Sequence, residues 1–343
     1  MKAVVIHGAK DLRIEQRDEE PVGPGQVRVA IEAGGICGSD LHYYNHGGFG
    51  TVRVREPMIL GHEVAGTVKT LGAGVSGFAV GDRVAISPSR PCSHCEYCLR
   101  GEQNHCLDMR FYGSAMPIPH IQGAFRQSLV AEQWQCHKVA DGISTNLAAM
   151  AEPFAVTLHA VARAGSLIGK RVLVTGCGPI GALAIIAARV HGAREIVATD
   201  LADATLKKAL EVGADRTINV ATDAAKLEAY AVNKGYFDVQ FEASGSEKAV
   251  RSGLEMLRPR ATLVQLGLGG DIAIPQNTIV AKEIEMKGTF RFHEEFGLAV
   301  DLINTRRVDL KPLLTGVFAL DDAVAAFEAA GDRGRSMKVQ LAL

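Results

Sequence analysis

The chain has 343 residues, of which 47% are hydrophobic and 22% charged, a balance typical of a soluble globular protein with room for two domains. Its 37 basic and 38 acidic side chains leave a net charge of −1, so the composition favours neither a nucleic acid nor a membrane surface as a partner. The apolar start of the chain is too short for a signal peptide, and no apolar run reaches the length of a membrane span, so we expect a cytoplasmic protein.

The first 90 residues predict an antiparallel, barrel-like β domain. Short apolar runs with a period of two alternate there with glycine and proline breaks, which is the pattern of half-buried strands joined by turns. The predicted strands cover residues 3–6, 12–15, 27–31, 64–70 and 83–86.

The stretch from residue 34 to residue 63 holds side chains suited to binding a metal. It reads GGICGSDLHYY and later PMILGHE, and Cys37, His62 and Glu63 offer the sulfur, nitrogen and oxygen donors that zinc accepts. The donors come from two separated segments, which is typical of an active-site metal rather than a compact structural knot. An isolated Cys–His pair is more often structural, but the glycines around His62 let the backbone turn tightly and approach a metal closely.

Closely spaced cysteines predict a second, structural zinc. They lie in the segment PCSHCEYCLRGEQNHC and are Cys92, Cys95, Cys98 and Cys106. Four thiolates close a tetrahedral shell and leave no open position for a substrate. An iron–sulfur cluster and a redox pair are the alternatives, and a cluster is disfavoured because the neighbouring residues are polar and no second set of cysteines follows. Cys136 and Cys177 lie in apolar runs and are interpreted as small core residues.

Two segments then lead towards a second domain. Residues 108–127 form an irregular loop broken by glycine and proline, which is either plain connection or a wall of the substrate pocket. Residues 148–164 predict a helix with Pro153 in its first turn. Glu152 stands in this otherwise apolar run, and a buried carboxylate is costly unless it has a partner. Glu152 is therefore a candidate site residue.

A dinucleotide-binding fingerprint begins at residue 171. A buried strand at 171–175 is followed by GCGPIG and then by an apolar-periodic helix, and Asp200 follows Gly181 by 19 positions at the end of the next strand, 196–199. Between a strand and a helix, such glycines let a pyrophosphate approach the helix N-terminus. The carboxylate would bind the ribose hydroxyls and repel a 2′-phosphate, so NAD is preferred over NADP. The candidate cofactor-binding residues are Gly176, Gly178, Pro179, Ile180, Gly181 and Asp200.

The alternation of strands and helices continues and predicts a doubly wound parallel sheet. Further strands are predicted at 217–220, 238–242, 261–267 and 284–288, with helices at 224–232 and 247–257. The tail, with helices at 295–304 and 321–330 and a strand at 338–341, is expected to return to the first domain. The expected division is a catalytic domain of residues 1–147 and 290–343, with a zinc lobe at about 90–107, and a nucleotide-binding domain of residues 148–289.

Along nearly its whole length the chain resembles the zinc-dependent medium-chain dehydrogenases, in particular their sorbitol and L-idonate dehydrogenase branch. The motifs that carry the resemblance are GGICGSDLHYY, PMILGHE, CSHCEYC, DMRFYGSAM, AEPFAV, GPIG, KGYFDVQFE and FRF. The resemblance implies a GroES-like β-barrel catalytic domain and a Rossmann nucleotide-binding domain. It also implies a catalytic and a structural zinc, NAD with NADP possible, and a homodimer or homotetramer paired at a sheet edge near residues 271–275.

The same resemblance implies the mechanism of a dehydrogenase. Zinc held by Cys37 and His62 binds a secondary hydroxyl, and Ser39 takes its proton and passes it via the nicotinamide ribose to His42 and solvent, while Asp40 orients His62. The family often has a third cysteine ligand where this chain has Glu152. Glu63 and Glu152 therefore both stand as candidates for the third ligand.

The implied substrate is a sugar acid or a polyol. The segment FYGSAM favours L-idonate, while sorbitol, xylitol and L-threonine stay open as alternatives. A sugar acid brings a carboxylate that some cation should meet. The candidate substrate-binding residues are the cations Arg110, Arg291 and Arg55, the apolar walls Tyr43, Phe111 and Phe292, and Glu152.

A non-catalytic alternative is a zinc-stabilised protein that uses its nucleotide domain as a redox sensor. Ser39, His42 and Glu152 beside the metal donors argue against it, because binding alone needs no proton path.

Overall fold

The computed structural model describes all 343 residues, which form two compact units. The first unit contains Met1–Glu152, His293–Arg307 and Leu314–Leu343, and the second contains Pro153–Phe292 and Val308–Leu313. The second unit is therefore inserted in the sequence of the first.

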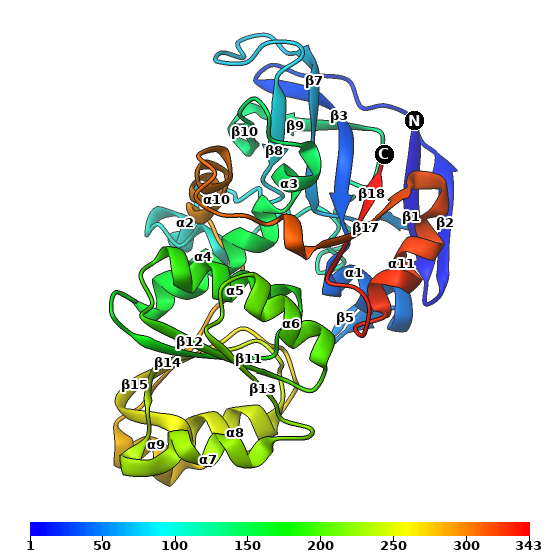
Figure 1. Cartoon of the computed structure of the whole chain (residues 1–343). Helices are drawn as coiled ribbons and strands as arrows, with labels where there is room; N and C mark the ends of the chain where they lie inside the picture. The colour runs from blue at the N-terminus through cyan, green and yellow to red at the C-terminus, as the bar shows by residue number, and fades with distance from the viewer. The chain divides into compact units, whose positions relative to one another are not determined.

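A seven-stranded sheet forms the centre of the first unit. Its strands are β3 (Gln26–Gly35), β7 (Glu63–Leu71), β8 (Arg83–Ile86), β9 (Ser128–Glu132), β10 (Cys136–Lys138), β17 (Leu314–Ala319) and β18 (Lys338–Ala342). The order is β10-β8-β7-β3-β18-β17, and β9 also pairs with β3 (Figure 1). Every pairing is antiparallel, as predicted, except that of β17 with β18.

Smaller elements complete the first unit. The sheet β2-β1-β6 consists of β1 (Lys2–Gly8), β2 (Asp11–Gln16) and β6 (Met58–Ile59), and β4 (Gly48–Phe49) pairs with β5 (Val52–Arg53). The helices are α1 (Gly38–His46), α2 (Glu96–Leu99), α3 (Thr145–Ala149), α10 (Glu295–Asn304) and α11 (Ala323–Gly331), with 3₁₀ turns η1 (Gln103–His105), η2 (Gln133–Gln135) and η6 (Leu320–Asp322).

The sequence did not predict strand β17. Its side chains alternate between half-buried and exposed, so its apolar pattern is weak. After β17 the chain continues through helix α11 and returns as β18, which pairs with β17 in parallel. A parallel pair needs such a crossover connection, and α11 provides it.

The core of the first unit contains Phe125, which is fully buried and meets Phe327 edge to face at 6.3 Å between ring centroids. Strand residues such as Val29, Val68 and Ile86 pack in the same cluster. The core is therefore built from the inward faces of several strands together with one face of α11.

The second unit is a doubly wound parallel sheet, which confirms the expected fold class. Its strands are β11 (Arg171–Thr175), β12 (Glu195–Asp200), β13 (Arg216–Asn219), β14 (Phe237–Glu242), β15 (Leu257–Gln265) and β16 (Glu285–Gly288). They lie in the order β13-β12-β11-β14-β15-β16, and every pairing is parallel. The order reverses between β11 and β14, and this switch point is where such sheets bind ligands.

Helices cover both faces of this sheet. They are α4 (Ala151–Ala164), which starts in the first unit, α5 (Pro179–Val190), α6 (Asp203–Glu211), α7 (Glu228–Ala231), α8 (Glu247–Met256) and α9 (Gln276–Lys282), with 3₁₀ turns η3 (Ala224–Leu227), η4 (Val232–Lys234) and η5 (Lys311–Leu313). Figure 1 shows α5 and α6 on one face and α7, α8 and α9 on the other. No helix combines the length and the apolar character needed to cross a membrane.

Two predicted helices differ from the structure. The helix expected at 148–164 is interrupted at Met150, which separates α3 from α4. The helix expected at 224–232 is a succession of η3, α7 and η4 in which no residue is buried. A regular helix of this length gains most of its stability from a buried apolar face, and here only Leu227 and Tyr230 pack, partly buried, against the core.

Replacement of Phe125 by alanine should destabilise the first unit by about 3–5 kcal/mol, because a fully buried aromatic ring leaves a cavity. The chain has a single tryptophan, and Trp134 lies in the first unit, so its fluorescence during urea unfolding reports this unit. The control is Val80→Ala, since Val80 is 64% exposed and its truncation should change the free energy of unfolding by less than about 0.5 kcal/mol. Equal unfolding midpoints for the two variants would contradict the prediction.

Candidate functional site

Helix α1 positions the first group of site residues. Cys37 is its N-cap residue, and the Cys37 backbone N–H donates to Asp40 Oδ2 at 3.0 Å, as in a capping box. The other oxygen, Asp40 Oδ1, accepts the N–H of Gly61 at 3.3 Å. Asp40 is fully buried, and burial raises the pKa of its carboxyl although the neighbouring His62 opposes the shift. This carboxylate therefore links the start of α1 to the loop that carries His62.

The loop at Gly61 turns the next residue, His62, into the interior. Gly61 has φ +92°, and a Cβ there would lie 2.2 Å from the ring of Phe125, so the position requires glycine. The His62 ring is 5% exposed and its centroid lies 5.4 Å from that of Phe111. His62 Nδ1 has no hydrogen-bond partner and lies 3.8 Å from Asp40 Oδ1, beyond hydrogen-bonding distance.

The structure brings Cys37, His62 and Glu63 together. One donor atom from each lies within 4.8 Å of the others. Glu152, at the start of α4, is outside this group but close enough to interact with it electrostatically. Burial raises the pKa of Glu152 to about 7, the charge of His62 opposes the shift, and the charge of Glu63 adds to it. Of the two carboxylates considered for the third ligand, the geometry thus groups Glu63 with the other donors.

Lys338, which the sequence did not single out, is part of the site. Its Nζ donates to both carboxylate oxygens of Glu63 at 2.8 Å each and to the carbonyl of Ile36 at 3.2 Å. Lys338 is 3% exposed; burial lowers its pKa, but the charges of Glu63 and Cys37 outweigh burial and raise it overall. A lysine at the start of the apolar strand β18 was the available signal in the sequence.

These side chains fit a divalent cation. Three carboxylates, those of Asp40, Glu63 and Glu152, are buried beside the Cys37 thiol. Lys338 pairs with Glu63, and although burial opposes it, the charges of Asp40, Cys37 and Glu152 raise the pKa of His62, so the site favours positive charge. Uncompensated buried charge is costly, and the raised pKa values of Asp40 and Glu152 show that burial disfavours their charged forms. Zinc accepts sulfur, nitrogen and oxygen donors and leaves an open position when three protein groups bind it.

Ser39 and His42 lie three positions apart in α1, so they share one side of the helix. Ser39 is half-buried and His42 is more exposed. Partial burial lowers the pKa of His42, and the neighbouring His46 and Arg333 lower it further. The His42 imidazole is therefore neutral at physiological pH and able to accept a proton.

Three of the expected substrate-binding residues lie in or against the loop at 108–127. The Tyr43 hydroxyl accepts a hydrogen bond from the N–H of Ala115 at 3.1 Å, and Phe111 packs on His62. Arg110 immediately precedes Phe111 and has an exposed side chain.

The other candidate cations occupy different surroundings. Arg55 is exposed, and its backbone N–H donates to His120 Nε2 at 2.9 Å. Arg291 and Phe292 belong to the second unit, where the Arg291 guanidinium lies 4.9 Å from the ring centroid of Phe290 and Phe292 is fully buried. The structure therefore does not place Arg291 and Phe292 in the unit that holds the metal donors.

The four-cysteine lobe forms a second metal-binding arrangement. The thiol sulfurs of Cys92, Cys95, Cys98 and Cys106 all lie within 4.8 Å of one another. The N–H of Cys92 donates to the sulfur of Cys106 at 3.1 Å, and that of Cys95 donates to the sulfur of Cys92 at 3.3 Å. Backbone N–H groups of Cys98 and Leu107 lower the pKa of the Cys95 thiol to about 6. This group of four sulfurs fits a closed tetrahedral zinc shell.

The glycine-rich loop of the second unit connects β11 to α5. Gly178 is the N-cap residue of α5 and Pro179 is its first residue, with Ile180 and Gly181 following in the first turn. The carboxylate of Asp200, at the end of β12, accepts the N–H of Cys177 at 2.6 Å.

Asp200 also caps the loop that follows it. Its Oδ1 accepts the N–H groups of Leu201 and Ala202 at 2.7 and 3.0 Å. The carboxylate is thus held at the end of its strand, beside the turn that begins at Gly176. At this position a carboxylate can accept hydrogen bonds from the hydroxyls of an adenosine ribose.

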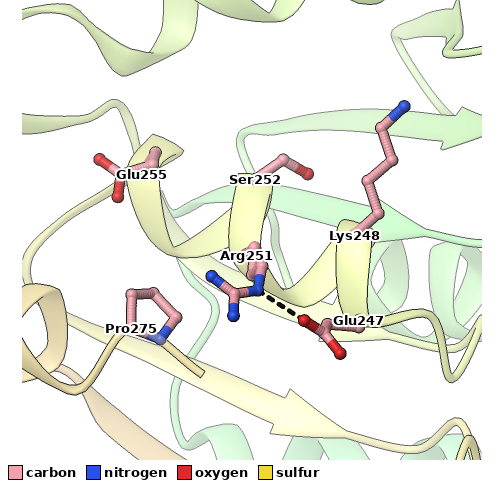
Figure 2. A pocket seen from close by; sticks show the side chains of 6 residues that line it. All are labelled: Glu247, Lys248, Arg251, Ser252, Glu255 and Pro275. Atoms are coloured by element: carbon pink, nitrogen blue, oxygen red, sulfur yellow. Dashed lines mark hydrogen bonds and ion pairs between the residues drawn. The ribbon is translucent and has the colours of Figure 1, made fainter. Parts of the chain in front are cut away.

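A surface hollow of about 550 Å³ lies over α8 (Figure 2). Its lining comprises Glu247, Lys248, Arg251, Ser252 and Glu255 of the helix together with Pro275. The facing charges pair with each other, Arg251 Nε lying 2.8 Å from Glu247 Oε1, and no group of metal donors is present. This hollow carries none of the chemistry described above.

Two protein-family models match the chain in succession. Residues 23–141 match the alcohol dehydrogenase GroES-like domain, and residues 179–305 match the zinc-binding dehydrogenase domain. L-idonate 5-dehydrogenase (NAD(P)(+)) of Escherichia coli (strain K12) is 41% identical over 341 residues, which are 99% of this chain and 98% of that protein. Sorbitol dehydrogenase of Gallus gallus is 36% identical over 345 residues, 99% of this chain and 95% of that protein.

A solved structure agrees with these matches. The crystal structure of L-idonate 5-dehydrogenase from Escherichia coli str. K-12 aligns with a TM-score of 0.96 at 40% identity, covering 100% of this chain and 98% of that chain.

Replacement of Cys98 by alanine should remove the structural zinc while leaving the other metal in place. We expect the metal content to fall by one zinc per chain, and the lobe at 90–107 to become sensitive to proteolysis, because a structural zinc contributes about 10–16 kcal/mol of apparent binding free energy. Elemental analysis and limited proteolysis measure both effects. Cys136→Ala, which removes a buried thiol outside the lobe, is the control and should keep its full metal content. Undiminished zinc in the Cys98 variant would refute the assignment.

Proposed function

The chain belongs to the zinc-binding dehydrogenases of the alcohol dehydrogenase family, and we propose that it oxidises one secondary hydroxyl of L-idonate to give 5-keto-D-gluconate, with NAD as the hydride acceptor. The observation that carries the proposal is the group of half-buried Cys37 with buried His62 and Glu63, which offers three donors to a catalytic zinc. The choice of substrate is supported by the 41% identity to a relative of that activity along 99% of the chain.

The first unit supplies the metal donors and the proton path. Zinc, when bound there, lowers the proton affinity of a hydroxyl group. The Ser39 hydroxyl accepts the proton that the substrate releases. His42, three residues further along α1, receives it on a neutral ring nitrogen and passes it to solvent.

Other charged residues of the site orient the metal donors. Lys338 Nζ engages both oxygens of Glu63, so the carboxylate is oriented before a metal binds. Asp40 fixes the loop of His62 through the N–H of Gly61, which keeps the imidazole beside Cys37. Glu152, whose pKa lies at about 7, is a further buried carboxyl available to a substrate hydroxyl.

The second unit supplies the nucleotide site. The residues proposed to bind the cofactor are Gly176, Gly178, Pro179, Ile180, Gly181 and Asp200. NAD, when bound, supplies the hydride acceptor. A carboxylate at the end of β12 favours ribose hydroxyls and repels a 2′-phosphate, so we expect NAD to be used more efficiently than NADP.

A cation must meet the carboxylate of an aldonate substrate. Arg110 is the strongest candidate because it is exposed and directly precedes Phe111, whose ring packs on His62. Arg55, also exposed in the first unit, is the alternative. Oxidation of an uncharged polyol such as sorbitol or xylitol is the second candidate function, favoured by the 36% identity to a sorbitol dehydrogenase, and L-threonine is a further alternative.

We also propose a homodimer or homotetramer in the cytoplasm. Residues 271–275, where the pairing edge was expected, form no strand. Strand β16 ends the six-stranded sheet, so its outer edge has no strand partner within the chain and is available to a second copy. None of the seven cysteines forms a disulfide bond, which suits a reducing compartment. A sedimentation coefficient matching a monomer would contradict the oligomer.

The proposed activity is tested by steady-state kinetics on zinc-replete protein. We expect the highest kcat/KM for L-idonate with NAD among L-idonate, D-gluconate, sorbitol, xylitol and L-threonine, each measured with NAD and with NADP. A higher value for sorbitol would establish the polyol alternative. Absence of NADH formation with every substrate, despite full zinc content, would exclude a dehydrogenase and support the sensor alternative.

Replacement of Arg110 by alanine should raise KM for L-idonate by about tenfold or more, because the substrate loses a charge-assisted hydrogen bond. KM for sorbitol should change little, since sorbitol has no carboxylate. Arg13→Ala, which removes an exposed arginine paired with Asp11 at 2.7 Å, is the matched control. An equal rise in KM for both substrates would exclude Arg110 as the carboxylate-binding residue. A rise in KM for L-idonate alone in Arg55→Ala would assign that role to Arg55.

A further inference from the structure

A buried polar cluster lies at the ends of the two central strands of the second unit. Thr175 ends β11 and Glu242 ends β14; they are paired in register and are 2% and 0% exposed. The Thr175 hydroxyl lies 3.4 Å from Glu242 Oε1, and Gln240 Nε2 donates to the Thr175 hydroxyl at 3.1 Å. A buried carboxylate needs several hydrogen-bond donors, so its presence here calls for an explanation.

The position of this cluster coincides with the switch point of the sheet. β12 is the neighbour of β11 on one side and β15 is the neighbour of β14 on the other. The connection from β11 to β12 and the connection from β14 to β15 therefore run in opposite directions across the sheet. In open parallel sheets, this arrangement forms a crevice at the carboxyl ends of the strands, and a dinucleotide binds there. Thr175 and Glu242 are the last residues of the strands that flank that crevice.

The carboxylate of Glu242 ties two loops to the sheet. It accepts the N–H groups of Ser244 and Gly245 at 2.9 Å each, and it also accepts the Ser244 hydroxyl. Gln265, the last residue of β15, donates from Nε2 to Glu242 Oε2 at 2.5 Å and to the carbonyl of Gly267 at 2.8 Å. All of these partners are hydrogen-bond donors. One carboxylate therefore accepts the hydrogen bonds of the loop after β14 and also binds the side chain at the end of β15.

The loops joined in this way pack backbone against backbone. A Cβ on Gly267 would lie 2.2 Å from the nitrogen of Gly245, and one on Gly269 would lie 1.7 Å from its oxygen. A Cβ on Gly176, the first glycine of the dinucleotide fingerprint, would lie 2.8 Å from the nitrogen of Ser244. Glycine loops are conformationally free and have no side chains to anchor them, so their shape depends on an external anchor.

We propose that Glu242 is a positioning residue for the dinucleotide: its buried charge holds the loop at 243–245 against Gly176 and against the loop at 266–269, and so preforms the floor of the crevice. The proposal rests on the proposed use of NAD. Glu242 does not itself touch the reacting atoms; it acts through the backbone groups that it orients, so its loss should weaken binding of the nucleotide before it affects the rest of the enzyme.

Glu242→Gln is the decisive variant because it keeps the size of the side chain. The amide offers one acceptor oxygen, and its NH₂ group must face at least one of the donors from Ser244, Gly245 or Gln265, which leaves that donor unpaired. We expect the Kd for NADH, measured by nucleotide fluorescence, to rise about tenfold or more. KM for NAD should rise in parallel, while KM for L-idonate at saturating NAD and the zinc content stay within about twofold of the original values.

The matched control is Glu211→Gln, which makes the same chemical change on the surface of the same unit. Glu211 is the exposed last residue of α6, where its carboxylate pairs with Lys208 at 2.6 Å. Its Kd for NADH should equal that of the original protein. An equal rise in both variants would mean that loss of any charge in this unit weakens binding, and it would overturn the proposal.

A second variant keeps the test decisive if Glu242→Gln does not fold. Gln265→Met removes one donor to Glu242 and the bond to Gly267 but leaves the buried charge with its Ser244 and Gly245 partners. We expect a rise of a few-fold in the Kd for NADH. An unchanged Kd in a folded variant of either kind would overturn the role of Glu242 alone, whereas failure of the original protein to bind NADH or NADPH would overturn the proposed cofactor as well.

Discussion

The metal site depends on the burial of several acidic groups around one imidazole. Asp40, Glu63 and Glu152 are each 5% exposed or less, and the Cys37 thiol lies among them. In water these groups would be well solvated, but in the interior each needs a compensating charge or hydrogen-bond donor. Backbone N–H groups serve Asp40 and Lys338 serves Glu63, and a divalent cation held by the three donors would add further positive charge. The excess of buried acidic groups thus favours the binding of a cation such as zinc.

The site can form only when the two ends of the first unit are assembled. β18 pairs with β3 through Gly34 and Gly35, and this pairing carries Lys338 to the carbonyl of Ile36 and to Glu63. The nitrogen of Lys338 therefore reaches its partners only after the chain has passed through the second unit and returned. The last strand therefore contributes both backbone hydrogen bonds to the sheet and a positive charge beside Glu63.

The two units use buried carboxylates in a similar way. In the first unit, Asp40 joins the start of a helix to the glycine turn before His62. In the second, Glu242 joins the end of β14 to the loops beside the fingerprint glycines. In both places a charge with several hydrogen bonds stabilises backbone that contains glycine, and glycine is needed there because a Cβ would collide with neighbouring atoms. At both sites, a buried carboxylate therefore holds a glycine-containing loop in a fixed shape.

The sequence by itself determined the features that depend on short spacing. The four cysteines of the lobe lie within 15 consecutive residues, and the fingerprint glycines, β11 and the helix α5 follow one another directly, so local patterns were sufficient to predict them and the parallel sheet. Only the tertiary structure grouped Glu63, and not Glu152, with Cys37 and His62 and placed Arg291 and Phe292 in the second unit. It also revealed the pairing of Lys338 with Glu63 and the hydrogen bonds of Glu242. The reason is physical: Lys338 and Glu63 are 275 positions apart, and such a contact is set by how strands pair and pack, which leaves no periodic trace in the residues around either one.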